Sequence, residues 1–222
     1  MSETKGRGAY HHGALPEALM AAAFEVLDEQ GQAKVSVREV ARRAGVSAGA
    51  PFRHFADREA LLTALADRVL ADLMRWQEAE VAAAGSGGGA SAESGGGSGG
   101  GSGGGSVMRT VGLGFVRYAM RHPRRFELVR SRVFTSAREP ELREQLDGID
   151  RALTDVVVAD QEAGRLRPGD PALVRLAGQA LVYGLAQMIV DGYLPPERAE
   201  ELAGQVLDTF GQGIAMANRP AP

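Results

Sequence analysis

The sequence predicts an all-α protein of about nine helices, with a three-helix helix-turn-helix domain at the N-terminus and a helical domain at the C-terminus. Apolar residues recur at spacings of three and four, whereas the alternation that marks strands is missing. Glycines and prolines stand at the expected helix ends. A tract rich in glycine and serine separates two helical halves. These observations indicate a helical protein of two domains.

The first two helices follow from apolar spacing and from capping residues. The first helix is expected over about 14–30, with Gly31 just past its end. Ser36 is expected to cap a second helix that ends near Gly45, and Glu39 would complete a capping box.

The third and fourth predicted helices precede the glycine-rich tract. Ser47 is expected to cap a short third helix that reaches Phe55, and a fourth helix is expected over 57–84. Residues 85–106 then hold thirteen Gly and six Ser in 22 positions. This composition forms no packed core, so we expect a flexible linker that acts as a surface loop after an intact helix. Its regular GGGS repeats resemble a designed insert, and one sequence leaves a natural origin equally open.

Five further helices are expected after the linker, because prolines and a glycine divide the apolar pattern there. They span about 107–121, 124–135, 141–163, 171–191 and 196–217. No strand is expected in either half.

Composition narrows the class of protein. The 222 residues carry a net charge of −3 and include no cysteine, which excludes disulfides and thiolate metal sites. The N-terminal residues lack the apolar stretch of a secretory signal, and no run of about 18 apolar residues suggests a membrane span. We therefore expect a cytoplasmic protein.

The most informative stretch is residues 35–62, VSVREVARRAGVSAGAPFRHFADREALL. Two short helices joined at residues 44–47 form a helix-turn-helix, in which Gly45 accepts the left-handed conformation of the tight turn. Small Ala41 permits a close crossing of the helices. The apolar contacts between them are expected from Val37, Val40, Val46, Phe52 and Phe55.

The charge of this stretch suits a nucleic acid. Residues 34–58 carry six cationic side chains against two acidic ones, a difference of +4. Affinity for phosphates depends on the face presented, so the overall acidity does not exclude DNA. Helical proteins without a DNA role also use such motifs, and the motif alone leaves both interpretations open.

Residues 9–62 resemble the DNA-binding domain of the TetR family of transcription regulators. The resemblance rests on YHHG at 10–13, on the first helix ALPEALMAAAFEVLDEQG and on the block SVREVARRAGVSAGAPFRHFADREALL, which match in order and spacing. The C-terminal half resembles the family in its helical architecture and in LVYGLA at 181–186. The resemblance implies a homodimeric DNA-binding regulator with a helical domain that senses a small molecule.

The resemblance also implies roles by position. A recognition helix at 47–54 would contact base edges, with Arg53 the best candidate for a guanine contact. Phosphate contacts are expected from the start of the second helix and from the cationic and polar residues around it. An N-terminal arm would add contacts to the backbone or the minor groove. The residues implied for DNA are Ser36, Val37, Arg38, Ser47, Ala48, Gly49, Ala50, Phe52, Arg53, His54, Arg58, Lys5 and Arg7.

Two residues depart from the family pattern. Phe52 stands where members of the family usually have tyrosine, so one hydroxyl contact to phosphate is absent. Pro51 lacks an N–H, but near the first turn of a short helix that donor has no partner. The change at Phe52 should weaken affinity modestly, and DNA binding is still expected. Side-chain readout of sequence is thin because Ala48, Gly49 and Ala50 lack side-chain donors.

The helix expected over 171–191 is apolar around most of its circumference, which indicates burial on two sides. The resemblance supplies a second copy of the chain as the partner for one side. A helix buried wholly within one chain is the alternative. The residues expected at the dimer interface are Leu173, Ala177, Gly178, Ala180, Leu181, Gly184, Val206 and Phe210.

An effector pocket, if present, is expected among the helices at 107–163 and 171–191. Bulky apolar and aromatic side chains there are candidates for its lining, although each also fits an ordinary core. They are Phe115, Tyr118, Phe126, Val133, Phe134, Leu153, Tyr183 and Met188. The residues indicate no chemical class for the ligand.

Enzyme and metal sites are not expected. Adjacent His11 and His12 in a mobile arm offer two ligands at most, and no nucleophile motif, phosphate-binding glycine loop or HExxH motif occurs. We therefore expect no catalytic residue, no metal and no cofactor. The expected partners are double-stranded operator DNA, a second copy of the chain and an unidentified small molecule, without a membrane.

Three functions remain open at this stage: a ligand-responsive repressor, a constitutive DNA-binding regulator without a ligand, and a helical protein-interaction module. The first follows the family most closely. Under this interpretation the chain consists of an arm at 1–12, a DNA-binding domain at 13–56, a connecting helix at 57–84, the linker at 85–106 and a regulatory and dimerisation domain at 107–217.

Overall fold

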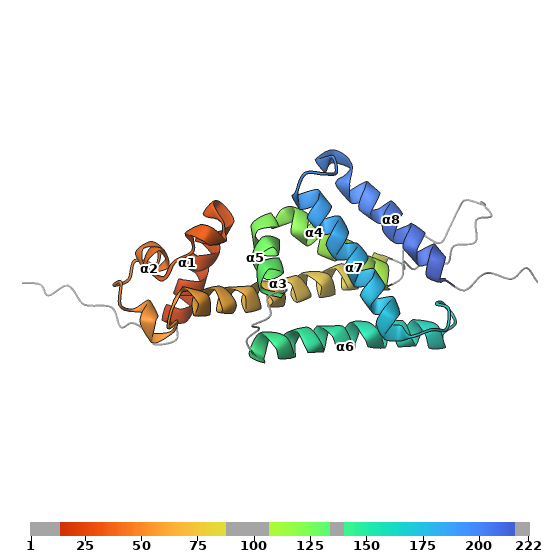
Figure 1. Cartoon of the computed structure of the whole chain (residues 1–222), viewed down its shortest axis with the longest axis horizontal. Coiled ribbons are helices and arrows are strands. Elements are labelled where there is room, and N and C mark those ends of the chain that lie inside the picture. The colour runs from red at the N-terminus through yellow and green to blue at the C-terminus, as the bar shows by residue number, and fades with distance from the viewer. Residues whose placement is uncertain (1–13, 88–106, 134–139, 216–222) are drawn as a thin grey trace, which may run out of the picture.

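The computed structural model describes residues 14–87, 107–133 and 140–215. Within these ranges the chain forms eight α-helices, three short 3-10 helices and no strand, which confirms the all-α prediction. Helix α3 (Arg58–Gly87) runs along the long axis of the molecule. It joins α1 (Ala14–Gln30) and α2 (Val37–Arg43) at one end to the remaining helices (Figure 1).

The C-terminal helices pack on the later part of α3 and on each other. α4 (Val107–Arg121) contacts α3, α7 (Pro171–Val190) and α8 (Ala199–Ile214). α5 (Pro123–Val133) contacts both α3 and α1, and α6 (Pro140–Glu162) crosses the first part of α7 (Figure 1). α5 therefore belongs to the C-terminal half but touches the N-terminal one.

One hydrophobic core fixes the helix-turn-helix to the start of α3. Val26 of α1 and Val40 of α2 are fully buried against Leu65 and Val69 of α3, and Leu128 of α5 extends the same cluster. Burial of these apolar side chains is the main stabilising contribution in such a domain. The N-terminal helices and the first half of α3 are thus one packed unit.

The predicted ends of the first two helices are confirmed. α1 ends at Gln30, and Gly31 follows with φ 81°. Gly45 takes φ 68° in the turn after α2, the left-handed conformation that this turn requires.

Only half of the predicted capping box forms at α2. The hydroxyl of Ser36 accepts the Glu39 N–H at 3.2 Å. The carboxylate of Glu39 instead accepts two hydrogen bonds from Arg42, at 2.6 and 2.8 Å. A bidentate pair with a guanidinium is stronger than a bond to one backbone N–H, which explains the difference.

The prediction of a third α-helix over residues 47–55 is wrong. Residues 48–50 form turns and are followed by a 3-10 helix (η2, Pro51–Arg53). The N–H of Ala50 donates to the Ser47 carbonyl, and the N–H of His54 donates to the Pro51 carbonyl. These bonds span three residues, because Pro51 has no N–H to continue an α-helical ladder.

Several predicted segments lie partly or wholly outside the described residues. α3 continues to Gly87, three residues beyond its predicted end, and residues 88–106 of the expected linker are not described. The arm with Lys5 and Arg7 is also outside the described ranges. The expectations for these segments stay untested.

α7 is long and apolar enough to cross a membrane, which the sequence analysis did not expect. A single helix of this kind is weak evidence, because helices of globular domains pass the same test. Arg175 of α7 forms an ion pair with Asp150 of α6 at 2.7 Å, and α7 packs on α4, α6 and α8. α7 is therefore an element of the helical bundle.

Candidate nucleic-acid interface and cavity

The segment expected to contact bases forms an exposed face on the helix-turn-helix. Pro51 and Phe55 are buried beneath it, together with Val37 of α2. Ala50 is half-buried at its edge. The exposed side chains and glycine are Ser47, Ala48, Gly49, Phe52, Arg53 and His54.

The prediction that Phe52 packs between the helices is wrong. Its side chain is 52% exposed, whereas Pro51 occupies the buried position beside it. The 3-10 geometry turns residue 51 inward and residue 52 outward. Phe52 therefore belongs to the exposed face, where the resemblance also placed it.

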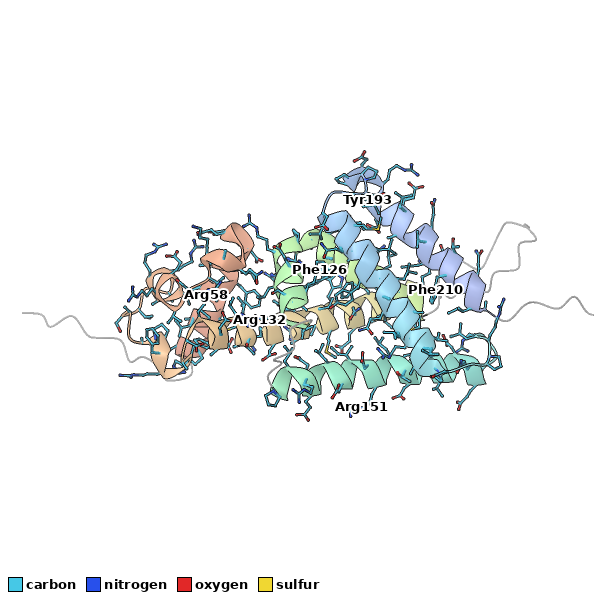
Figure 2. All side chains as sticks on the ribbon, viewed as in Figure 1. Arg58, Phe126, Arg132, Arg151, Tyr193 and Phe210 are labelled. Carbon is cyan, nitrogen blue, oxygen red and sulfur yellow. The ribbon has the colours of Figure 1, made fainter. Side chains whose placement is uncertain are left out.

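Three of the six cationic side chains in residues 34–58 form ion pairs or hydrogen bonds within the protein. Arg42 pairs with Glu39, and Arg43 pairs with Glu29 at 2.7 Å. Arg58 donates to the backbone carbonyls of Val35 and Gln32, at 2.9 and 2.8 Å. Arg58 thus fixes the start of α3 to the segment before α2 (Figure 2).

The other three cations lie open to a partner. Within the described part of the chain, Lys34, Arg38 and Arg53 form no ion pair. All three are exposed. These residues carry the positive charge that the exposed face can offer to phosphates.

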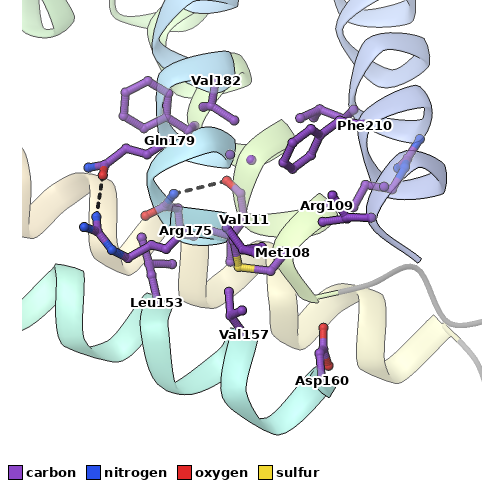
Figure 3. Close-up of a pocket in the computed structure, with 18 of the residues that line it drawn as sticks. Met108, Arg109, Val111, Leu153, Val157, Asp160, Arg175, Gln179, Val182 and Phe210 are labelled. Atoms are coloured by element: carbon purple, nitrogen blue, oxygen red, sulfur yellow. Dashed lines mark hydrogen bonds between the residues drawn. The ribbon is translucent and has the colours of Figure 1, made fainter. Parts of the chain in front are cut away.

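A cavity of about 550 Å³ lies between α3, α4, α6, α7 and α8 (Figure 3). Three of the residues predicted for a pocket line it: Phe115, Leu153 and Tyr183. Helix α3 also lines the cavity, which its sequence did not indicate, because an apolar stripe of this kind is equally typical of a core helix. The lining residues of α3 are Leu70, Leu73, Met74 and Gln77.

The other residues predicted for a pocket lie elsewhere. Tyr118 is buried against Trp76, and Met188 is exposed on α7. Phe126 lies behind the cavity wall, where its ring meets that of Phe115 edge to face at 5.9 Å. Val133 ends α5, and its side chain and Phe134 are outside the described residues.

Aromatic rings join the cavity to α5. The ring of Phe115 lies 5.0 Å from that of Tyr183, and Phe126 of α5 lies 6.0 Å from Tyr183. Burial raises the pKa of Tyr183 to about 12, so its hydroxyl is protonated at neutral pH. A change at the cavity wall can therefore reach α5 through direct ring contacts.

The charged side chains of the cavity occur as ion pairs. Arg109 donates to Asp208 of α8 at 3.0 Å, and this guanidinium holds the pKa of Asp208 below its ordinary value. Arg165 donates to Asp160 at 2.6 Å. The cavity is thus apolar with compensated charges at its rim.

α7 presents an apolar stripe on its outer side. Leu173 is 62% exposed, and Leu176, Ala177, Ala180, Gly184 and Met188 are exposed along the same helix. Four of the residues expected at a dimer interface belong to this stripe: Leu173, Ala177, Ala180 and Gly184.

The other four face the interior of the protomer. A Cβ at buried Gly178 would lie 3.6 Å from the ring of Phe210, and both residues line the cavity. Leu181 and Val206 pack against the core that contains Leu113. Gly178 therefore permits a close approach of α7 and α8 within one chain.

No group of three or more residues able to hold a metal occurs among the described side chains. His11 and His12 lie outside the described ranges.

The sequence and the fold match known regulators. Residues 19–65 match the bacterial regulatory proteins of the tetR family, and residues 108–210 match the tetracyclin repressor-like C-terminal domain. A protein of unknown function from Rhodococcus sp. RHA1 is 27% identical, with a TM-score of 0.77 over 95% of this chain and 100% of its own.

Two further structures share the fold at lower identity. A TetR-family transcriptional regulator from Pectobacterium atrosepticum is 17% identical, with a TM-score of 0.67 over 94% of this chain and 100% of its own. The ketosteroid transcriptional regulator KstR2 of Mycobacterium tuberculosis is 18% identical, with a TM-score of 0.56 over 95% and 100%. Together with the exposed helix-turn-helix face, these matches show that the chain belongs to the TetR family of DNA-binding transcription regulators.

Proposed function

We propose that this regulator is a cytoplasmic homodimeric repressor that leaves a palindromic operator when a small molecule binds in the cavity. The observation that carries the proposal is the exposed face over residues 47–54, because α3 connects that face directly to the cavity. One helix thus begins next to the DNA-binding face and lines the cavity with its later part.

Contacts to DNA would divide between phosphates and bases. Lys34 and Arg38 supply positive charge for phosphates, and Arg53 can donate two hydrogen bonds to a guanine in the major groove. Ser47, Ala48 and Gly49 offer little side-chain readout, so thymine methyl contacts and DNA shape would add to specificity.

Dimerisation would cover the apolar stripe of α7. Exposed leucines on this helix leave a contiguous apolar surface that a second copy can bury by the same residues, as a twofold interface requires. Two exposed helix-turn-helix faces held about one DNA turn apart would then bind the two halves of a palindrome.

Release from DNA would operate through α3. Leu73 and Gln77 lie at the cavity, whereas Arg58 at the other end of the helix is bonded to the segment before α2. A ligand that favours a different position of α3 would change the separation of the two DNA-binding faces.

The test is binding of the purified protein to the intergenic DNA upstream of its gene and to a scrambled duplex, over a salt series. We expect a preference of at least about a thousandfold for one palindrome, with affinity that falls steeply with salt. Arg53→Ala should weaken specific binding by about 10–100-fold, from the loss of one bidentate base contact.

Arg151→Ala is the matched control, because Arg151 is exposed on α6, far from the helix-turn-helix (Figure 2). It should leave DNA affinity unchanged. Equal affinity for both duplexes would contradict the proposal and favour a protein-interaction role. Operator binding that no cavity ligand reverses would favour a constitutive regulator.

A further inference from the structure

The wall of the cavity is mostly hydrocarbon. Apolar side chains from all five helices line the space, among them Leu70, Phe115, Val157, Val182 and Phe210. Figure 3 labels the last three around it. A pocket of about 550 Å³ is of the size that holds a small organic molecule. An apolar wall favours an apolar occupant, because binding then removes hydrocarbon surface from water on both sides.

Each arginine that lines the cavity already has an acidic partner. Arg109 pairs with Asp208 and Arg165 with Asp160. Arg175 pairs with Asp150 at 2.7 Å, and its side chain is only 13% exposed. Among the described side chains, the cavity lining therefore offers no uncompensated charge to a ligand.

An ionic ligand would have to break one of these pairs. A carboxylate that recruited Arg165 would leave Asp160, which is 6% exposed, without its counter-ion. A cation would have to displace the guanidinium of Arg165 from Asp160. Loss of the counter-ion is costly for a buried carboxylate, because its charge stays in an environment of low polarity.

Two amide side chains provide polar groups without charge. Gln179 accepts a hydrogen bond from Arg175 at 2.6 Å through Oε1, which assigns the amide and leaves the two N–H donors of Nε2. Gln77 donates from Nε2 to the Val111 carbonyl at 3.1 Å, which leaves its Oε1 as an acceptor. Both glutamines line the cavity.

We propose that the cavity binds an uncharged, mainly apolar molecule that carries a carbonyl or hydroxyl oxygen, which accepts a hydrogen bond from Gln179. Such a molecule would have on the order of 12–25 non-hydrogen atoms. The proposal rests on the proposed function, because it takes this cavity as the effector site. It adds the chemical class of the effector.

Calorimetry of the purified full-length protein, without DNA, tests the class with two matched sets of probes. The first set is 2-undecanone, undecanoate and undecylammonium. The second is 2-acetylnaphthalene, 2-naphthoate and 2-naphthylmethylammonium. We expect a ketone to bind at least about tenfold more tightly than both ions of its set. An ion that binds as tightly as its ketone, or no binding by any probe near its solubility limit, overturns the proposal.

A charge variant tests the ion-pair argument itself. Asp150→Asn removes the negative charge that pairs with Arg175. Asp150 is half-exposed and does not itself line the cavity. We expect it to raise the affinity for undecanoate by about tenfold and to leave that for 2-undecanone unchanged. Asp147→Asn, at an exposed position on the same helix, is the matched control and should change neither affinity. Unchanged undecanoate affinity in a folded Asp150→Asn protein contradicts the inference.

The two proposals fail separately. Operator binding is measured without ligand, and probe binding is measured without DNA. Intact operator binding with the wrong probe selectivity overturns the ligand class alone. Lost operator specificity overturns the proposed function, whatever the calorimetry shows.

Discussion

Arg125 of α5 donates to Asp28 of α1 at 2.6 Å from Nη2 and at 2.9 Å from Nε, and so joins the C-terminal domain to the DNA-binding domain. The same guanidinium lies over the ring of Phe24 at 4.6 Å and reaches Asp72 of α3 at 3.5 Å. Its hydrogen bonds to Asp28 raise the pKa of Arg125 above its ordinary value. One side chain of α5 therefore contacts both α1 and α3 at the junction of the domains.

Loss of this junction should destabilise the protein. Arg125→Met keeps most of the hydrocarbon stem but removes the charge, and we expect a free energy of unfolding lower by about 1–2 kcal/mol. Asp28→Asn should cost less, because the arginine keeps Asp72 and the ring of Phe24. Urea unfolding of both single variants and of the double variant gives the coupling energy. Additive effects would show that the two side chains do not interact in solution.

Any side chain at Gly45 should lower the stability of the protein, although the space around this residue is open. Its φ of 68° is unfavourable for other residues, so Gly45→Ala should lower the free energy of unfolding by about 1–2 kcal/mol. Gly49 has no neighbour within 4 Å and no positive φ, so Gly49→Ala is the control and should leave stability unchanged or slightly raised. Equal thermal unfolding midpoints for the two variants would contradict the strain at Gly45.

Phe52→Tyr should tighten DNA binding. The ring is exposed on the candidate DNA-binding face, so an added hydroxyl meets solvent in the free protein and can donate to a phosphate in the complex. We expect a gain of about 1 kcal/mol, or roughly fivefold in operator affinity, at unchanged stability. Phe55→Tyr is the matched control: Phe55 is buried, and its hydroxyl should lower stability without a gain in affinity. Affinity equal to wild type in Phe52→Tyr would place this ring away from phosphate.

Leu173→Arg should dissociate the proposed dimer. A guanidinium in the apolar stripe of α7 would be buried without a partner, so we expect the dimer dissociation constant to rise by at least about a hundredfold. Sedimentation equilibrium measures it directly. Val107→Arg, at another exposed apolar position, controls for the added charge and should leave the constant unchanged. A dimer that survives Leu173→Arg intact would place the interface on another surface.

Stability should fall in mild acid through His122. Burial, followed by the charge of Arg125, holds the pKa of His122 below its ordinary 6.5, and its ring packs on Tyr118 at 4.9 Å. The unfolded chain therefore binds the proton more readily, and stability present above pH 6.5 is lost as the pH falls toward the folded pKa. Unfolding curves at about pH 7.5 and about pH 5.5 measure this loss. His122→Gln should show a smaller loss, and an equal loss in both proteins would remove His122 as its source.

The N-terminal domain illustrates how much local sequence can determine. Gly31 and Gly45 mark helix ends because few other residues adopt positive φ, and Ser36 caps α2 because its hydroxyl accepts a nearby N–H. These effects operate within four residues, so they could be predicted from spacing alone. The exposure of Phe52 could not, because it depends on a 3-10 turn at Pro51 that the apolar pattern does not distinguish from an α-helix.

The cavity illustrates the opposite case. The sequence indicated Phe115, Leu153 and Tyr183, yet it also indicated Tyr118 and Met188, which lie elsewhere. An apolar residue on a helix is equally suited to a core, a cavity wall or an exposed stripe, and only the neighbouring helices decide which.

By itself, the sequence determined the helical fold, the Ser36 cap, the turn at Gly45 and the family of the protein, because each depends on residues close together in the chain. The tertiary structure alone decided which arginines are compensated. Asp208 reaches Arg109 across 99 positions, and Asp28 reaches Arg125 across 97. The electrostatics of the cavity and of the domain junction arise from such distant pairs, since charge compensation depends on distance in space.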